Sequence, residues 1–200
     1  VGGGRDDGRG QGEASPLFVN RRVFSVRASG MFWLSPTPDR PSLGWGAAYR
    51  RIATWAHVRR LADGLRLLVV NTHWDHVSAD ARYESARLLQ GWIAAHRRPG
   101  ERILLIGDFN AGSDDPAIQR LQSPGGAAAL ADARDRAEIA IGNSASFNNF
   151  KVQPAHGDPI DHILVGSGLD VRSWHVLAEH FDGRLASDHF PVIADLVPSP

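Results

Sequence analysis

The chain has 200 residues, of which 42% are hydrophobic and 22% charged, as expected for one ordinary globular domain. Lys plus Arg and Asp plus Glu both number 22, so the formal net charge is zero and disfavours a long polyanionic partner. With no cysteine the chain forms neither a disulfide nor a thiolate site, and it has no apolar run of the ~18 residues that a membrane span needs. The composition leaves the compartment unknown, and we expect a monomer.

The first residues, VGGGRDDGRGQGEASPLF, begin without methionine and look like the tail of a strand followed by a Gly-rich charged loop. They predict that residues 1–200 are a single domain whose N-terminal part is missing. Two strand-like runs follow within residues 16–34 and form a plausible hairpin joined at residues 20–22. Residues 35–48 carry three prolines and two glycines, which indicates a long surface loop.

The middle of the chain predicts a regular alternation of elements. Residues 52–60 and 65–73 form a second pair of strands turned at Asp63-Gly64, and the second of them should be central because it is almost wholly apolar. Apolar residues at helical spacing then predict an amphipathic helix over residues 78–96, capped by Ser78. A strand over residues 102–106 and a short helix that begins at Asp115-Pro116 come next.

The last third is less regular. Residues 125–145 are Ala-rich and partly helical, and they give no definite element. Short strands are predicted at IDHILVG, VRSWHVLAEH and HFPVIADLV. A strand, helix and strand flanked by antiparallel pairs indicate an α/β chain with two packed mixed sheets covered by helices.

Four predicted strand ends are followed at once by acidic, amide or imidazole groups. They are NTHWDH at 71–76, GDFN at 107–110, PIDHI at 159–163 and ASDHFPV at 186–192. Each alone has an ordinary explanation, since an Asp after a strand is usually a turn former and a lone His is more often structural. Side chains at strand ends are held by the core yet reach solvent, so four such termini predict one shared site.

In this order and spacing, the four motifs resemble those of the endonuclease/exonuclease/phosphatase superfamily, from about residue 5 to the C-terminus. The opening GRDDGRGQGE is similar to a bacterial branch of that superfamily with no settled substrate. The resemblance implies a four-layer α/β/β/α sandwich and metal-dependent hydrolysis of a phosphate ester, either a phosphodiester or a phosphomonoester. The cofactor would be Mg²⁺, or else Mn²⁺ or Ca²⁺, bound by oxygen ligands.

The resemblance also implies a role for each site residue. Asp188 matches the metal-site aspartate, while Asp108 and Asn110 match the pair that orients the attacking water and supports metal and phosphate. His73 and His189 match two facing histidines with acid and base roles, and which of them is the base stays open. Their carboxylate partners would be Glu13 and Asp161, respectively. Asp75, Arg5 and Arg51 are candidate substrate-binding residues, and Asp75 with Asn71 would order the His73 loop.

The chain departs from the family pattern at its start. Family members begin with a strand carrying an Asn and a later strand ending in a metal-binding Glu, and both come before Val1 here. The resemblance therefore predicts a sandwich that lacks its first strands, with weak metal binding and an unpaired sheet edge if Val1 is the native start.

Other interpretations stay open at this stage. NTHWDH could belong to a zinc hydrolase, although the position two before His73 is Asn71, and the domain could be a degenerate binding module without catalysis. The substrate could be a lipid head group, a sugar phosphate or nucleic acid, and Phe32, Trp33 and Trp45 could contact it. The remaining histidines are predicted to be structural or on the surface: His57, His76, His96, His156, His162, His175 and His180.

Overall fold

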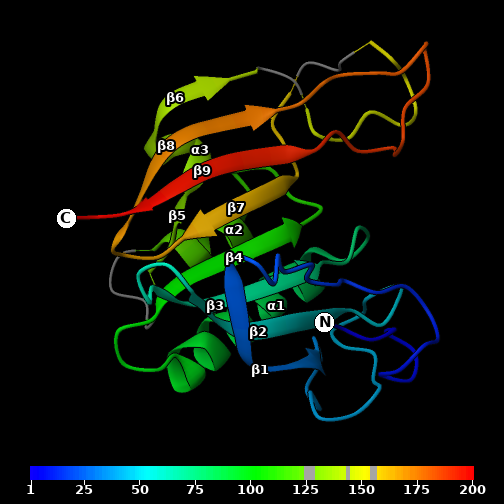
Figure 1. The fold of residues 1–200 in the computed structure, drawn as a ribbon. Coiled ribbons are helices and arrows are strands. Elements are labelled where there is room, and N and C mark those ends of the chain that lie inside the picture. The colour runs from blue at the N-terminus through cyan, green and yellow to red at the C-terminus, as the bar shows by residue number, and fades with distance from the viewer. Residues whose placement is uncertain (124–128, 143–144, 154–156) are drawn as a thin grey trace.

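The computed structural model describes residues 1–123, 129–142, 145–153 and 157–200 (Figure 1). Its elements are β1 (Phe24–Trp33), β2 (Ile52–Arg60), β3 (Arg66–His73), α1 (Ala79–His96), β4 (Arg102–Asp108), α2 (Pro116–Gln122), β5 (Ala131–Asp132), α3 (Ala133–Arg136), β6 (Ala137–Ile141), β7 (Asp161–Val165), β8 (Leu169–Val176) and β9 (Val192–Pro198). No helix among the described residues is long and apolar enough to cross a membrane.

The strands form two sheets, and both are mixed. The six-stranded sheet has the order β1-β2-β3-β4-β7-β5, in which β3 and β4 are parallel and the other neighbours are antiparallel. The three-stranded sheet has the order β6-β8-β9, with β6 parallel to β8. The α/β sandwich with two mixed sheets is confirmed, and β3 is central as predicted (Figure 1).

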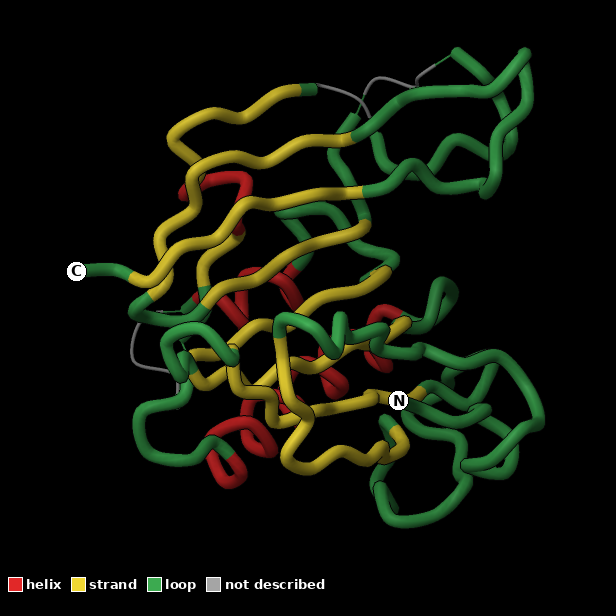
Figure 2. The backbone as a smooth tube through the Cα atoms, in the orientation of Figure 1, coloured by secondary structure: helices red, strands yellow, loops and turns green. Residues whose placement is uncertain are grey.

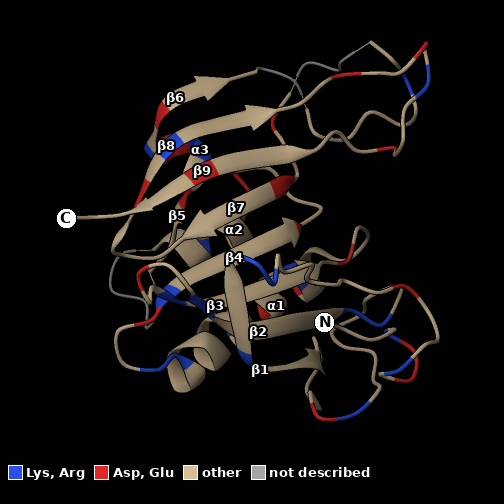
Figure 3. Ribbon diagram, in the orientation of Figure 1, with Lys and Arg blue, Asp and Glu red and all other residues tan. Residues whose placement is uncertain are grey.

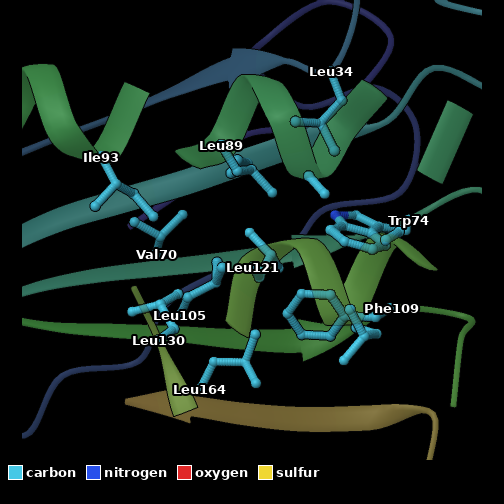
Figure 4. Packing of buried hydrophobic residues seen from close by; sticks show 14 of the residues in the cluster. Leu34, Val70, Trp74, Leu89, Ile93, Leu105, Phe109, Leu121, Leu130 and Leu164 are labelled. Atoms are coloured by element: carbon cyan, nitrogen blue, oxygen red, sulfur yellow. The ribbon is translucent and has the colours of Figure 1, made fainter. Parts of the chain in front are cut away.

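The main core lies between the six-stranded sheet and the helices α1 and α2. Helix α1 begins where the Ser78 hydroxyl accepts a hydrogen bond from the backbone of Ala81, as the capping pattern predicts. Its apolar stripe, which includes Leu89 and Ile93, is fully buried against Val70 and other apolar side chains of the central strands (Figure 4). This packing fixes the two central strands whose ends carry the polar motifs.

The predicted hairpin within residues 16–34 is wrong in its first half. Only its second run forms a strand, β1. Asn20 does make the turn, because its backbone oxygen accepts from the amides of Val23 and Phe24. The Leu17 amide instead donates to the backbone oxygen of Val1. The first run therefore pairs with the start of the chain, a partner that local turn chemistry does not indicate.

Most of the other predicted elements are confirmed, including the β2–β3 pair, α1, β4 and α2. The loop over residues 35–48 contains no helix or strand. The Ala-rich segment holds β5, α3 and β6, with residues 124–128 and 143–144 outside the described part. Figure 2 shows long loops gathered at the right-hand ends of the strands, where the polar motifs lie.

Candidate active site

Strand register brings three of the four motifs together. In the parallel pair β3–β4, His73 lies opposite Asp108, and in the antiparallel pair β4–β7, Asp108 lies opposite Asp161. Residues opposite each other on neighbouring strands point to the same face of a sheet. Figure 3 shows the start of β7 beside the end of β4. The sheet itself therefore places one imidazole and two carboxylates side by side.

His73 is held between two carboxylates. Its Nδ1 forms a short hydrogen bond with Glu13, and its Nε2 lies 3.2 Å from Asp108 Oδ2. The hydrogen bond with His73 lowers the pKa of Glu13 to about 2. The Glu13 carboxylate therefore fixes which imidazole nitrogen faces the cleft, as the resemblance implies.

Glu13 reaches His73 through the loop of residues 4–14. The loop closes where Gly4 bridges Ala14 and where the Arg5 amide donates to the Glu13 carbonyl at 2.9 Å. Gly4 is needed at this closure, since a Cβ there would lie 2.0 Å from the backbone oxygen of Gln11. The same closure places the Arg5 side chain against Glu13, with 2.9 Å between Nη1 and Oε2.

His189 forms the second imidazole–carboxylate pair. Its Nδ1 lies 2.7 Å from Asp161 Oδ2, and its Nε2 lies 3.9 Å from Asp108 Oδ2. The hydrogen bond with Asp161 raises the pKa of His189. A bridge to Phe147 and a hydrogen bond from the Phe190 amide to the Ser146 carbonyl fix the segment that carries His189.

Asp108 lies between the two imidazoles. Burial raises its pKa, although the nearby His73 acts in the opposite direction. The strand can end here only because residue 107 is glycine: its φ is 141°, and an added Cβ would lie 1.9 Å from the Thr72 carbonyl of the paired strand. The two Nε2 atoms thus face one partly buried carboxylate oxygen.

Asn110 turns back toward this carboxylate. Its φ of 49° is in the left-handed region, which Asn tolerates better than most residues, and its amide donates to Asp108 Oδ1 at 2.8 Å. Its side-chain Nδ2 donates to the Trp74 carbonyl at 2.9 Å, which leaves the side-chain oxygen available for the cleft. Asp188 lines the same cleft beside His189.

The chemistry of this donor set fits a divalent cation. Ligand atoms of Asp108, Asp161 and His189 lie within 4.8 Å of one another. Asp161 and His189 already bond to each other, however, so a metal that used both would replace that hydrogen bond. Asp108, Asn110 and Asp188 all line the cleft and carry side-chain oxygens, the ligand type that suits a hard cation such as Mg²⁺.

These residues line a cleft of about 590 Å³. Arg5, Glu13, Arg51, His73, Asp108, Asn110, Asp188 and His189 all contribute to its walls, whereas Asp161 stands behind His189. Asp75 is placed elsewhere. Its side chain is 1% exposed and accepts hydrogen bonds from four backbone amides, so it orders the loop after β3 and does not reach the cleft.

Four cleft residues were not predicted as parts of the site: Tyr49, His76, Phe147 and Ile160. His76 is exposed, as expected, and its Nδ1 lies 3.0 Å from Arg51 Nη2 on the cleft wall. Its place inside the NTHWDH motif was the available signal, whereas nothing in the Pro/Gly-rich loop distinguished Tyr49. His156 is outside the described residues.

The zinc interpretation of NTHWDH needs its polar side chains to converge on one metal. In the structure His73 bonds to Glu13, Asp75 to backbone amides and His76 to Arg51. These three side chains have separate partners, which disfavours a shared zinc ion. The aromatics Phe32 and Trp33 are buried, so they contribute to the core and leave substrate contact to other residues.

The fold is that of the α/β-sandwich phosphoesterases. The chain belongs to the Endonuclease/Exonuclease/phosphatase family, whose sequence model matches residues 6–189. Members of this family are hydrolases that act on phosphate esters. None of the curated proteins compared with the sequence matches it significantly.

Solved structures give the same result. A mannosyl-6-phosphatase of Bacteroides thetaiotaomicron shares 35% identity over 98% of this chain and 76% of its own, with a TM-score of 0.93. A functionally unknown conserved protein of Enterococcus faecalis shares 31% identity over 100% of this chain and 76% of its own, with a TM-score of 0.87. The human nocturnin catalytic domain, at 16% identity, 90% and 62% coverage and a TM-score of 0.62, shares the fold alone.

Proposed function

We propose that the protein hydrolyses a phosphate ester in a divalent-metal-dependent reaction centred on Asp108. The observation that carries the proposal is that two imidazoles, each held by its own carboxylate, direct Nε2 toward one oxygen of Asp108. Such supported imidazoles are suited to proton transfer, because their orientation is fixed before the substrate binds.

Each residue of the site has a separate role in the proposed hydrolysis. Asp108 accepts a hydrogen bond from the attacking water and orients it, while Asn110 contacts a phosphoryl oxygen. His73 and His189 exchange protons at Nε2 with the water and with the leaving oxygen. Glu13 and Asp161 hold the two rings by their Nδ1 atoms throughout.

Asp108, Asn110 and Asp188 are the residues that would hold Mg²⁺. When bound, the ion neutralises charge on the phosphoryl oxygens. Glu13, Asp108, Asp161 and Asp188 otherwise bring four carboxylates near the place where a phosphate must sit, with only Arg5 and Arg51 as opposing cations among the described residues of the cleft. A metal ion therefore removes a repulsion that the side chains alone would leave.

We further propose a phosphorylated sugar as the substrate. The related Bacteroides protein is a mannosyl-6-phosphatase and is 35% identical over 98% of this chain. A chain with zero net charge is also a poor match for duplex DNA, which is bound mainly through phosphate contacts. A phosphomonoester with a small leaving alcohol is consistent with both observations.

The test is a rate comparison with and without Mg²⁺ on hexose 6-phosphates, nitrophenyl phosphate, bis-nitrophenyl phosphate and DNA. Asp108→Asn and His189→Gln should each lower kcat by about 10²–10⁴-fold, the usual contribution of a positioned acid or base. His175→Gln is the matched control, because His175 lies on β8 and bonds to Ser173 outside the cleft. Wild-type turnover in either site variant would refute the roles proposed for Asp108 and His189.

A further inference from the structure

One wall of the cleft has features that the chemical step does not require. Tyr49, Arg5, Arg51 and His76, which we call the tyrosine wall, line the cleft beside His73 and Glu13. They come from the Gly4–Ala14 loop, the loop before β2 and the loop after β3. Within the described part of the chain, Asp108 has His73 and His189 as its ionic partners, and no residue of the tyrosine wall pairs with it. The wall therefore lies beside the reacting groups but is not one of them.

The Tyr49 ring is the exposed centre of this wall. The Arg5 guanidinium lies 4.8 Å from the ring centroid and that of Arg51 lies 5.8 Å from it. The His76 ring stacks on Tyr49, with 5.9 Å between centroids and 24° between planes. Cations over an aromatic face are attracted to it, so the ring is held in place before any ligand arrives. With 51% of its surface exposed, Tyr49 still presents part of its ring to the cleft.

The two arginines of the wall are already neutralised. Arg5 pairs with Glu13 at 2.9 Å, and Arg51 lies 3.5 Å from Asp75. The wall therefore has no uncompensated positive charge among its described residues with which to bind a second phosphate or another anion. This charge balance favours a neutral group at the wall.

Arg51 nevertheless retains donors without acceptors. Its side chain is 5% exposed, and Nε and Nη1 are buried and donate no hydrogen bond to any described residue. A buried donor without an acceptor costs free energy. These two nitrogens have almost no accessible surface, so a hydroxyl oxygen in the cleft would satisfy them only after the Arg51 side chain turns toward it, and it would add no charge. An aromatic face next to unpaired guanidinium donors suits a ring with apolar C–H edges and several hydroxyls.

We propose that the tyrosine wall is the leaving-group subsite and that it binds a neutral sugar ring, with Tyr49 as the specificity-determining residue. The sugar packs against the exposed part of the Tyr49 ring, and its hydroxyls accept from Arg51 once that side chain turns toward the cleft, while its phosphate lies next to Asp108. This inference rests on the proposed phosphoesterase function and adds which residues determine the selectivity for the leaving-group alcohol.

The test measures binding apart from turnover. Titration calorimetry with Mg²⁺, in which every protein also carries His189→Gln to slow turnover, would compare mannose 6-phosphate, ethyl phosphate and mannose 1,6-bisphosphate. The protein with Tyr49 intact should bind mannose 6-phosphate about tenfold more tightly than ethyl phosphate, the scale of one aromatic contact with a hydrogen bond. Tyr49→Ala should abolish this preference and leave ethyl phosphate binding unchanged. Tyr49→Leu, which keeps apolar bulk without a flat face, should do the same.

Tyr83→Ala is the matched control, because Tyr83 is the other tyrosine of the chain, lies under an arginine at 5.4 Å and is outside the cleft. It should retain the full preference. Equal binding of mannose 6-phosphate and ethyl phosphate by the protein with Tyr49 intact, or an unchanged preference in Tyr49→Ala, would overturn the proposal. Tighter binding of the bisphosphate than of the monophosphate would also overturn it, because the wall would then be an anion site.

The same variants separate this inference from the proposed function. If the protein with Tyr49 intact prefers mannose 6-phosphate in binding but the wild type hydrolyses no ester with Mg²⁺, the subsite stands and the phosphoesterase proposal fails. If the wild type hydrolyses mannose 6-phosphate and ethyl phosphate with equal kcat/KM and the calorimetry shows equal binding, the phosphoesterase proposal stands and the subsite fails.

Discussion

Replacing Asp75 by Asn should destabilise the protein by about 3 kcal/mol, although Asp75 does not reach the cleft. Its Oδ1 accepts from the amides of Val77 and Ser78, and its Oδ2 accepts from the amides of Ala48 and Tyr49. An Asn can keep the first pair through its oxygen but presents N–H donors to the second. Two lost bonds to a charged acceptor cost about 1.5 kcal/mol each.

The loss of charge adds to this cost, since Arg51 Nε lies 3.5 Å from Asp75 and would remain buried without a counter-charge. The assay is urea unfolding followed by tryptophan fluorescence, because Trp74 is fully buried next to this loop. A loss of about 3 kcal/mol corresponds to a fall in Tm of roughly 6–12 °C for a chain of this size. Asp80→Asn, an exposed acid in the first turn of α1, is the control and should change stability by less than about 0.5 kcal/mol.

The difference between wild type and Asp75→Asn should also depend on pH. Burial alone would raise the pKa of Asp75, but the backbone amides outweigh it and the net pKa is lowered. A carboxyl with a lowered folded pKa contributes stability above its unfolded pKa of about 3.9 and loses it as pH falls through the folded pKa. A variant as stable as the wild type at pH 7, or a difference that grows in acid, would refute this reasoning.

Three further predictions concern the site and its supports. Gly107→Ala should lower the free energy of unfolding by more than about 2 kcal/mol in urea titrations, because its Cβ would lie 1.9 Å from the Thr72 carbonyl. Gly91→Ala is the control and should be neutral or stabilising, because no atom lies within 4 Å of the added Cβ. Burial lowers the pKa of His162, but its hydrogen bonds to Asp132 and Ala111 outweigh burial and raise the pKa overall. The stability lost in Asp132→Asn should therefore be largest below pH about 6.5 and should shrink as pH rises through the folded pKa of His162. A stability difference that increases with pH would contradict this reasoning. Glu13→Gln should lower kcat by about 10–100-fold, since it loosens the His73 ring, and the lowered pKa of Glu13 means that it also costs some stability at neutral pH. Glu84→Gln, whose acid pairs with Arg87 on α1, should leave kcat unchanged, and equal rates in Glu13→Gln and the wild type would refute the role of Glu13.

The sequence predicts the central elements because their signals are local. Strand β3 is a continuous apolar run, and α1 combines a Ser cap with a helical stripe that ends at Ile93. Convergence of His73, Asp108 and Asp161 then follows from pairing of neighbouring strands, so motifs at strand ends were enough to predict it. The predicted hairpin at residues 16–34 fails because Leu17 pairs with Val1, a partner that no turn signal specifies.

The tyrosine wall was harder to predict, for a physical reason. Tyr49 is placed by Asp75, which lies 26 residues away in the sequence and holds its backbone amide. A loop that is held by one distant buried carboxylate has no periodic sequence pattern from which its conformation could be predicted. Arg5 and Arg51 could be named as candidates from charge alone, but the balance of that charge by Glu13 and Asp75 depends on tertiary contacts.

The NTHWDH segment connects stability to specificity in this fold. His73 points to Asp108, Asp75 points inward to the loop that carries Tyr49, and His76 contacts Arg51. Residues that share partners in this way are energetically coupled, so a change at Asp75 should displace the tyrosine wall before it displaces the reacting groups. Asp75→Asn should therefore lower kcat/KM for mannose 6-phosphate more than for ethyl phosphate at a temperature where both proteins are folded. An equal loss on both substrates would mean that the carboxylate supports the chemical centre and the wall alike.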